Sequence, residues 1–248
     1  MAANKRIILK LSGETLAPEN KSGSFDASRV DRAAEAIIKL HDMGVQVGIV
    51  LGGGNIWRGR FSDEMNPVNA DQMGMLATII NALAVQDAIV RLGRKATVLT
   101  AQEMTRFARL YTRDTALGLM EAGEIVLLSG GTGNPFFTTD TGAALRAAEL
   151  KADAVFKGTT VEGIFDSDPN ANPNAKLIPL VRGLDESIKK LAGVSSTTQG
   201  TGGMVTKLRA AELCFDCGCE MVIANGNNPA ALYDIVEGKP VGTRFVEK

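Results

Sequence analysis

The sequence predicts an α/β fold, a three-layer α/β/α sandwich with a mainly parallel central sheet. Short apolar runs alternate along the 248 residues with longer segments whose apolar residues recur at helical spacing. The apolar runs, such as Ile125-Val126-Leu127-Leu128, are continuous and not alternating, which is typical of parallel strands buried on both faces. Strand–helix alternation of this kind favours right-handed crossovers that cover both faces of one sheet.

The elements follow in order from these two patterns. Each predicted strand is a short apolar run, often ending in a polar or glycine-rich turn. Most predicted helices are Ala/Leu-rich segments, and Gly44, Gly93 and Gly218 act as stop signals after three of them. The predicted strands span residues 6–11, 45–51, 96–100, 125–129, 154–157, 220–224 and 243–246. The predicted helices span residues 27–43, 71–92, 113–121, 141–150, 184–191, 204–217 and 229–236.

Composition excludes several classes of protein. Lys and Arg total 27 against 28 Asp and Glu, so no basic stripe indicates nucleic-acid binding and no basic amphipathic helix indicates membrane binding. No apolar run approaches the ~20 residues of a membrane span, and no signal-peptide core is visible near the start. We therefore expect a cytoplasmic protein without nucleic-acid or membrane partners.

Three cysteines have the spacing C-x-x-C-x-C, which raises the question of a metal site. Cys214, Cys217 and Cys219 have no fourth cysteine nearby, and His41 is the only histidine of the chain. Two of them fall at the end of a predicted helix and one at the start of the next strand. We interpret them as buried structural thiols and expect no protein-held metal.

The most informative stretch is G-T-G-N-P-F-F-T-T-D, from Gly131 to Asp140. It follows a predicted buried strand and leads into a predicted helix, the place where open α/β sheets bind ligands. Free N–H groups and the helix dipole make such a junction an anion site. The loop is rich in hydroxyls, and Phe136 and Phe137 offer walls for a planar ligand. A loop that only turned the chain would not need these groups.

Three further glycine-rich segments suit phosphate groups. Lys10 closes the first strand before a Ser-Gly turn, and the glycines 52–54 precede Arg58, which can clamp phosphate oxygens. The segment 200–203 starts a helix that carries Lys207. For these three segments, in the order given, the alternatives are a surface lysine at a strand end, a plain glycine turn and a helix cap. Positioning and charge neutralisation are what phosphoryl transfer requires, although the standard nucleotide fingerprints are absent.

The motifs together are familiar. From residue 6 to about 169 the chain resembles the bacterial uridylate (UMP) kinases of the amino acid kinase superfamily. The motifs that carry the resemblance are K-L-S-G-E at 10–14, G-G-G-N-I-W-R-G at 52–59, D-Q-M-G-M-L-A-T at 71–78, the segment 131–140, and V-E-G-I-F-D-S-D-P at 161–169. Residues 176–248, with G-T-G-G-M-V-T-K and V-G-T-R-F, resemble glutamate 5-kinase instead. In that family the lysine matching Lys207 neutralises ATP phosphates.

The resemblance implies one amino acid kinase domain over residues 1–248, hexameric in bacterial members. It divides into a UMP-kinase-like acceptor half, 1–169, and a glutamate-5-kinase-like nucleotide-donor half, 170–248. The implied reaction is direct in-line transfer of the γ-phosphoryl group of Mg-ATP to UMP, giving UDP and ADP. Mg²⁺ would be held mainly by the nucleotide phosphates, and Asp140 would orient the lysines and the metal.

Site residues carry over position by position. The implied catalytic residues are Lys10, Arg58, Asp140 and Lys207. The implied ATP contacts are Lys10, Leu11, Ser12, Gly13, Gly54, Arg58, Thr159, Phe165 and Asp168. The implied UMP contacts are Gly53, Asp71, Thr132, Gly133, Asn134, Pro135, Phe136, Phe137, Thr138 and Thr139.

Two alternatives stay open beside a UMP kinase. One is glutamate 5-kinase or another kinase with an amino acid acceptor, which the C-terminal resemblance suggests. The other is a non-catalytic nucleotide-binding protein or an inactive hybrid. The Phe136-Phe137 loop favours a nucleotide acceptor, because an amino acid needs no wall for a base. The joint presence of Lys10, Arg58 and Asp140 favours catalysis, since a sensor has no need for transfer machinery.

Overall fold

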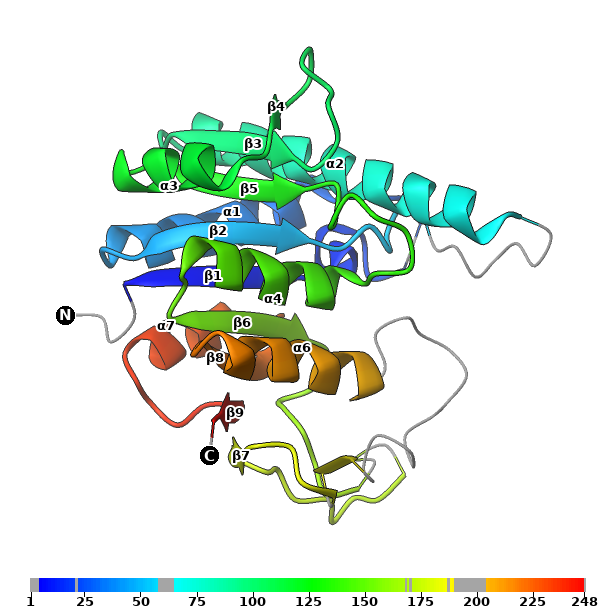
Figure 1. Ribbon diagram of the computed structural model, residues 1–248, viewed down its shortest axis with the longest axis vertical. Helices are drawn as coiled ribbons and strands as arrows, with labels where there is room; N and C mark the ends of the chain where they lie inside the picture. The colour runs from blue at the N-terminus through cyan, green and yellow to red at the C-terminus, as the bar shows by residue number, and fades with distance from the viewer. Residues whose placement is uncertain are drawn as a thin grey trace.

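A central sheet organises the chain, as the computed structural model shows (Figure 1). The structure describes residues 5–20, 22–57, 65–167, 169, 171–186, 188–189 and 204–247. Within these ranges nine strands form one sheet in the order β4-β3-β5-β2-β1-β6-β8-β9-β7. Neighbouring strands run parallel except at the β8–β9 pair. The predicted α/β fold with a mainly parallel sheet is confirmed.

The elements alternate along the chain as the sequence indicates. The strands are β1 (Arg6–Leu11), β2 (Gln46–Leu51), β3 (Ala96–Thr100), β4 (Arg109–Leu110), β5 (Ile125–Ser129), β6 (Ala154–Thr159), β7 (Leu180–Arg182), β8 (Glu220–Asn225) and β9 (Thr243–Val246). The helices are the 3-10 turn η1 (Gly13–Leu16), α1 (Ala27–Asp42), α2 (Pro67–Arg91), α3 (Arg113–Glu121), α4 (Thr139–Leu150), α6 (Met204–Asp216) and α7 (Pro229–Val236).

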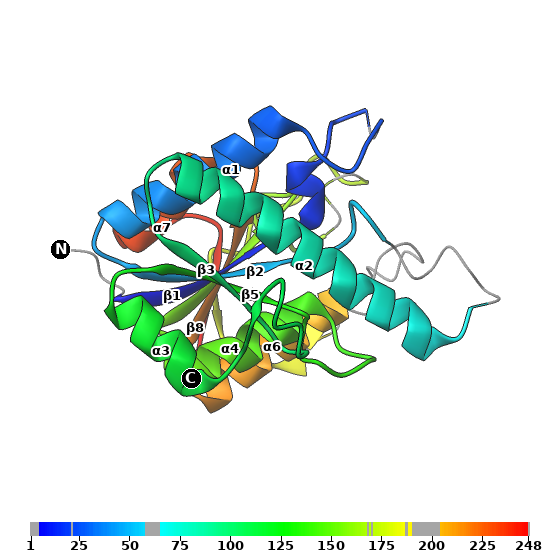
Figure 2. The same cartoon turned by 90° about the horizontal axis from the view of Figure 1, so that it is seen from above.

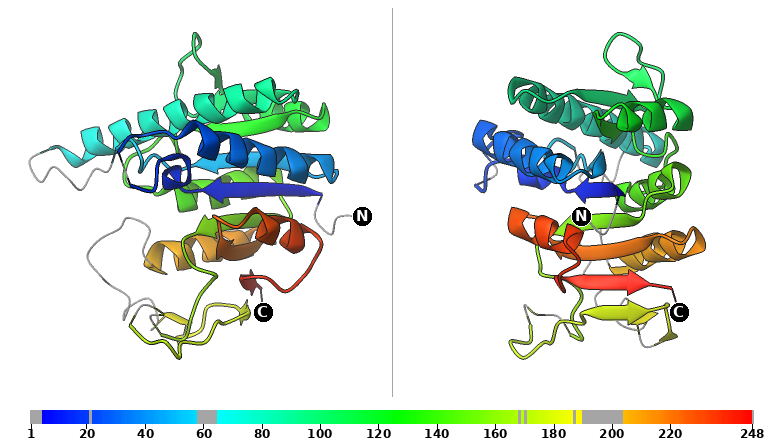
Figure 3. Two further views of the ribbon diagram at one scale, coloured as in Figure 1. Left: turned by 180° about the vertical axis from the view of Figure 1, so that it is seen from behind. Right: turned by 90° about the vertical axis from the view of Figure 1, so that its left-hand side faces the viewer.

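Helices cover both faces of the sheet, which gives the three layers. Figures 2 and 3 show α1, α2 and α7 on one side and α3, α4 and α6 on the other. Two separate clusters of buried apolar side chains fill the two interfaces. A sheet buried in this way has no solvated face, which is why its strands read as continuous apolar runs.

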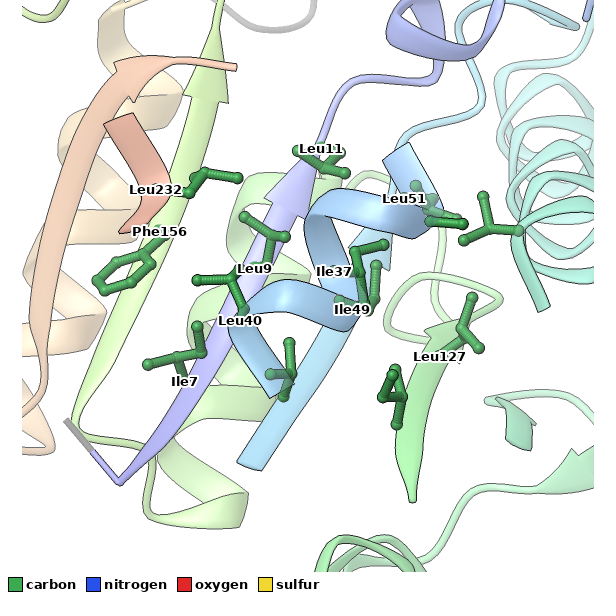
Figure 4. Packing of buried hydrophobic residues seen from close by; sticks show 14 of the residues in the cluster. Ile7, Leu9, Leu11, Ile37, Leu40, Ile49, Leu51, Leu127, Phe156 and Leu232 are labelled. Carbon is green, nitrogen blue, oxygen red and sulfur yellow. The ribbon is translucent and has the colours of Figure 1, made fainter. Parts of the chain in front are cut away.

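The pleat of β1 distributes its side chains between the two clusters. Ile7, Leu9 and Leu11 point toward α1, α2 and α7, where they pack with residues such as Phe156 (Figure 4). Ile8 belongs to the opposite cluster, under α3, α4 and α6. Because successive side chains alternate between faces, Lys10 lies on the α4 side of the sheet. Each large apolar side chain that is fully buried here contributes roughly 1.5–3 kcal/mol.

Boundaries differ from the predicted ones at helix starts and short strands. Helix α2 begins at Pro67 and not at 71, because Asn66 caps it by accepting a hydrogen bond from the Val68 N–H and proline suits the first turn. Helix α4 begins two residues before the predicted position. The sequence patterns missed β4 and β7, which are too short to carry a periodic signal. Of the predicted helix 184–191, residues 187, 190 and 191 lie outside the described residues.

Helix α2 requires a correction to the expectation about membrane spans. By length and composition it is apolar enough to cross a membrane, and it is the one such helix in the described part of the chain. Its Val85, Ala88 and Ile89 are fully buried against the sheet. We attribute its apolar character mainly to this packing.

The cysteines also differ in part from the prediction. All three are free thiols, and Cys214 and Cys219 are buried as expected. Cys217 is exposed, because it follows the last turn of α6 just before Gly218, which ends the helix in the left-handed region at φ 69°. Within the described residues no group of three or more His, Cys, Asp or Glu side chains is placed to hold a metal ion.

Candidate active site

The strand ends on one side of the sheet bring the polar segments together. Strands β1, β2, β5 and β6 all point toward the side where α2, α4 and α6 begin (Figure 1). The first turn of α4 is capped by the Thr138 hydroxyl, which accepts a hydrogen bond from the Thr141 N–H at 3.3 Å. Asp140 therefore lies inside the first helical turn, at the positive end of the helix dipole.

A buried cluster of one carboxylate and two ammonium groups forms the centre of this edge. The Asp140 Oδ1 atom lies 2.6 Å from the Lys157 Nζ atom and 3.0 Å from the Lys10 Nζ atom. The exposed fractions are 3% for Asp140, 5% for Lys157 and 8% for Lys10. The Oδ2 atom of Asp140 is buried and has no hydrogen-bond partner among the described residues. The cluster carries excess positive charge and keeps one carboxylate oxygen available.

Sheet register explains why the two lysines meet. Lys10 of β1 pairs with Lys157 of β6 in the parallel register, so both side chains leave the sheet on the same face. Above that face, α4 and α6 pack against each other through small, fully buried residues, including Ala143, Ala147 and Ala210. Small residues allow the two helices to approach closely. Asp140 of α4 and Lys207 of α6 are consequently held over the same lysine pair.

The charges gathered here shift the pKa values of Asp140, Lys157 and Lys207. Burial alone would raise the pKa of Asp140, but the charges of Lys10 and Lys157 outweigh it and hold that pKa well below its usual range. Burial, followed by repulsion from Lys10, lowers the pKa of Lys157 to about 7, although the ion pair with Asp140 opposes this. Burial also lowers the pKa of Lys207, and Asp140 and Lys10 both act on it electrostatically. Lys207 therefore shares the electrostatic environment of the cluster.

The loops after β1 and β2 lie next to the cluster. Leu11 is the buried last residue of β1, and Ser12 caps η1 by accepting a hydrogen bond from the Glu14 N–H. Gly13 follows directly. After β2, Gly53 passes so close to α2 that an added Cβ would lie 2.8 Å from the Ala77 Cβ and 2.9 Å from the Gly74 oxygen. Only glycine allows this approach, which places the backbone of Gly53 and Gly54 beside α2.

The predicted acceptor loop begins with a sharp reversal after β5. Gly130, Gly131 and Gly133 have positive φ angles of 75°, 61° and 82°. The Phe136 backbone is also left-handed, at φ 70°, and its N–H donates to the Asp71 Oδ2 atom at 2.6 Å. Asp71 of α2 and Phe136 of this loop, which are both predicted to contact UMP, thus contact each other.

The rest of this loop is exposed or half-buried. The Gln102 side chain donates to the Gly133 oxygen at 2.8 Å and ties the loop to the segment after β3. The rings of Phe136 and Phe137 are exposed by 72% and 58%. The loop residues predicted to contact UMP form one continuous run at the carboxyl edge, namely Thr132, Gly133, Asn134, Pro135, Phe136, Phe137, Thr138 and Thr139.

The predicted ATP contacts fall beside β1 and β6. Thr159 is the last residue of β6, and with Ser12 and Arg29 it lines a cavity of about 120 Å³ between η1, α1 and the end of β6. Phe165 lies in the excursion that follows β6, where it forms an isolated antiparallel bridge with Leu177. Arg58 and Asp168 lie outside the described residues. Roles for all of these residues stay predictions.

Sequence reasoning missed three residues that the fold places in or behind the site. The sequence pattern predicts Lys157 only as the end of a strand, although a lysine that closes a buried apolar run is the same signal that singles out Lys10. Thr78 and Asn81 of α2 are buried and bind the backbone of the glycine-rich loops. Their signal is weaker, because a single polar residue on an apolar helix face is common.

Comparison with known proteins places the chain among relatives of full length. Residues 5–225 match the model of the amino acid kinase family. The chain is 43% identical to a uridylate kinase of Bacteroides thetaiotaomicron and 42% identical to one of Phocaeicola vulgatus, in each case over 98% of both chains. The match therefore extends through most of the part that resembles glutamate 5-kinase. The division into an acceptor half and a donor half stays a prediction.

Solved structures agree with these matches. The fold is similar to that of UMP kinase from Bacillus anthracis, with a TM-score of 0.86 and 31% identity over 98% of this chain and 96% of that one. For UMP kinase from Ureaplasma parvum the TM-score is 0.83 and the identity 33%, over 98% of both chains. With the family model matched over most of its length and its strand-end lysines gathered on Asp140, this chain belongs to the amino acid kinase family.

Proposed function

We propose that this protein transfers the γ-phosphoryl group of Mg-ATP to UMP, giving UDP and ADP. The observation that carries the proposal is the buried cluster of Lys10, Lys157 and Asp140, which lies where the loop 131–140 passes into α4. Full-length relatives named uridylate kinases support the choice of UMP as acceptor. The glycine-rich loops supply backbone N–H groups that suit phosphates on either side of the cluster.

The chemistry assigned to the cluster is charge neutralisation in a direct in-line transfer. Lys10, Lys157 and Lys207 place ammonium groups where negative charge accumulates on the phosphoryl oxygens, and a buried site makes such groups effective. Asp140 holds the first two by ion pairs, so that they need not reorganise during the reaction. No general base is required, because the accepting phosphate oxygen is already ionised near neutral pH.

The residues present fit a magnesium ion that is bound chiefly by the nucleotide. Asp140 Oδ2 is a buried carboxylate oxygen without a hydrogen-bond partner among the described residues, and such an oxygen is a suitable ligand for Mg²⁺. The described residues offer no group of three His, Cys, Asp or Glu side chains around it. Mg²⁺ bound to the ATP phosphates would neutralise part of their charge. Asp140 is then its candidate protein ligand.

A coupled assay with Mg-ATP tests the proposal directly. The acceptors are UMP, CMP, glutamate, aspartate and carbamate, each at saturating concentration. We expect turnover with UMP and at least a hundredfold lower kcat/KM with glutamate. Turnover on glutamate without turnover on UMP favours a glutamate 5-kinase. Calorimetric binding of UMP and ATP without transfer favours a non-catalytic nucleotide-binding protein.

Lys207→Ala tests the phosphate role of the segment that resembles glutamate 5-kinase. If Lys207 neutralises charge in the transition state, the substitution lowers kcat at least tenfold, or about 1.4 kcal/mol of transition-state stabilisation. Steady-state kinetics with UMP measure this, and Arg209→Ala, an exposed position on the same helix, is the matched control. Unchanged kinetics for Lys207→Ala would contradict the phosphate role and leave this segment as the start of a helix only.

The pH profile tests the charge on Lys157. Its pKa of about 7 in the free protein means that the ammonium form declines as pH rises through neutrality. We expect kcat/KM for ATP, measured at UMP concentrations far below the KM for UMP, to fall above pH ~7, because this parameter then follows the free enzyme. In kcat the same limb should move to higher pH, since bound phosphates favour the ammonium form. A flat kcat/KM between pH 6.5 and 9 contradicts the role given to Lys157.

Self-association and a cytoplasmic location complete the proposal. Met73, Leu76 and Ile80 share one face of α2 and are 38%, 48% and 47% exposed, an apolar stripe that suits a second copy of the chain. Light scattering reports the resulting oligomer, which the family resemblance suggests is a hexamer.

Three free thiols are consistent with a reducing compartment.

A further inference from the structure

One face of α2 carries three polar side chains that bind the backbone of loops from two different strands. Asp71 accepts from the Phe136 N–H, Thr78 accepts from the Gly130 N–H, and Asn81 donates to the Gly52 oxygen. The spacings of seven and three residues correspond to about two turns and one turn of helix, so the three side chains share one face. The same helix thus contacts the loop after β2 and the loop after β5.

Asn81 forms a buried amide pair behind the phosphate loops. It is fully buried, and its Nδ2 atom donates to the Gly52 oxygen at 2.7 Å and to the Asn55 Oδ1 atom at 2.8 Å. Asn55 returns a hydrogen bond to the Asn81 Oδ1 atom at 3.0 Å. A Cβ added to Gly13 would lie only 2.9 Å from the Asn81 Nδ2 atom, so the β1 loop packs on the same amide.

Thr78 fixes the first peptide of the acceptor loop. Its hydroxyl donates to the Met75 oxygen within the helix at 2.7 Å, which leaves an oxygen lone pair for the Gly130 N–H at 2.9 Å. Gly130 is left-handed, and an added Cβ would lie 2.8 Å from the Thr100 Oγ1 atom. The reversal that starts the loop is therefore held on one side by β3 and on the other by Thr78, whose exposed fraction is 4%.

We propose that Thr78 and Asn81 are positioning residues for phosphoryl transfer, acting through the backbone of the two loops that they bind. This inference rests on the proposed function, because the loops are those assigned to the two nucleotides. Neither side chain reaches the lysine cluster through a described contact. Both hold their loops on one rigid helix of 25 residues, which keeps the loops at a constant separation. A displacement near 1 Å between reacting groups costs up to about a hundredfold in rate.

The two residues are expected to affect the two substrates differently. Thr78 holds only the loop assigned to UMP, so Thr78→Val should lower kcat/KM for UMP at least tenfold and leave KM for ATP within twofold. Asn81 also packs against Gly13 of the loop assigned to ATP phosphates, so Asn81→Ala should raise KM for both nucleotides. A merely structural role predicts no such division between substrates.

The test compares Thr78→Val with Thr78→Ser and with Thr97→Val. Serine keeps the hydroxyl and should restore kcat/KM to within threefold of the original protein. Thr97 also donates a side-chain hydrogen bond, to Glu124 Oε2 at 2.7 Å, but lies away from the carboxyl edge on β3. Its valine variant should retain full activity. Equal kinetics for Thr78→Val and the original protein, or equal losses in Thr78→Val and Thr97→Val, overturn the proposal.

Hydrogen exchange separates a failure of this inference from a failure of the proposed function. Thr78→Val should speed exchange of the Gly130 amide at least tenfold, with or without UMP kinase activity. If the original protein does not phosphorylate UMP, the function fails while the exchange result still tests the loop contact. If Thr78→Val does not fold, Thr78→Ala makes the same comparison with less steric demand. Unchanged exchange in a folded variant overturns the contact itself.

Discussion

Asp140→Asn is expected to lower kcat at least a hundredfold and to lower the free energy of unfolding by about 3 kcal/mol. The carboxylate is the partner of both Lys10 and Lys157, and an amide of the same size supplies no countercharge. Removing one partner of a buried ion pair typically costs 3–5 kcal/mol. We place the loss at the lower end because Lys157, whose pKa is already about 7, can release its proton.

Thermal unfolding and steady-state kinetics measure the two effects on one preparation. The matched control is Asp114→Asn, because Asp114 also lies in the first turn of a helix but has a 90% exposed side chain. It should change the free energy of unfolding by less than about 0.5 kcal/mol and leave kcat unchanged. A folded Asp140→Asn variant with near-normal turnover removes Asp140 from the transfer chemistry.

Lys157→Met is expected to lower kcat/KM about a hundredfold while the protein becomes no less stable. The methylenes of lysine and methionine fill similar space, and Asp140 keeps Lys10 as its ion-pair partner at 3.0 Å. Below pH ~7 the folded protein holds a buried ammonium group whose pKa is lower than in the unfolded chain, which costs stability. Methionine removes that cost, and because Asp140 keeps Lys10 as its partner, the substitution leaves no buried charge uncompensated.

The stabilisation expected from Lys157→Met should depend on pH. The cost of Lys157 is complete below its folded pKa of about 7 and disappears as pH approaches its unfolded value of 10.5. The gain in melting temperature from Lys157→Met should therefore be larger at pH 6 than at pH 10. Lys95→Met, at an exposed lysine before β3, should show no such difference. A Lys157→Met variant that retains normal turnover contradicts its place beside the phosphoryl group.

Much of the fold was predictable because its strands are buried on both faces. The run that forms β5 needs no partner to be recognised, since a continuous apolar segment between polar turns is itself the signal. The two-residue strand β4 has exposed side chains and therefore no such pattern. It pairs with β3 because the chain passes the sheet edge there, a tertiary circumstance that local sequence does not encode.

The candidate site was predictable where its residues lie in glycine-rich loops. Lys10 and Asp140 stand beside such loops, and the structure joins them at 3.0 Å. Lys157 stands in an ordinary strand, and only the register between β1 and β6 reveals that it faces Lys10. Thr78 could not be predicted either, because its partner Gly130 is 52 residues away in the chain. Contacts that depend on register or on helix placement cannot be read from one segment.

The register of Lys10 with Lys157 has a consequence for the energetics of turnover. Adjacent strands lie about 4.8 Å apart, a spacing set by backbone hydrogen bonds and independent of the loops. Two like charges are therefore forced together when the sheet assembles, and their repulsion is overcome by folding free energy. The electrostatic work of building an anion-attracting centre is complete before any nucleotide arrives. Each catalytic cycle then begins with the positive charges already in place, so no free energy of nucleotide binding is needed to bring them together.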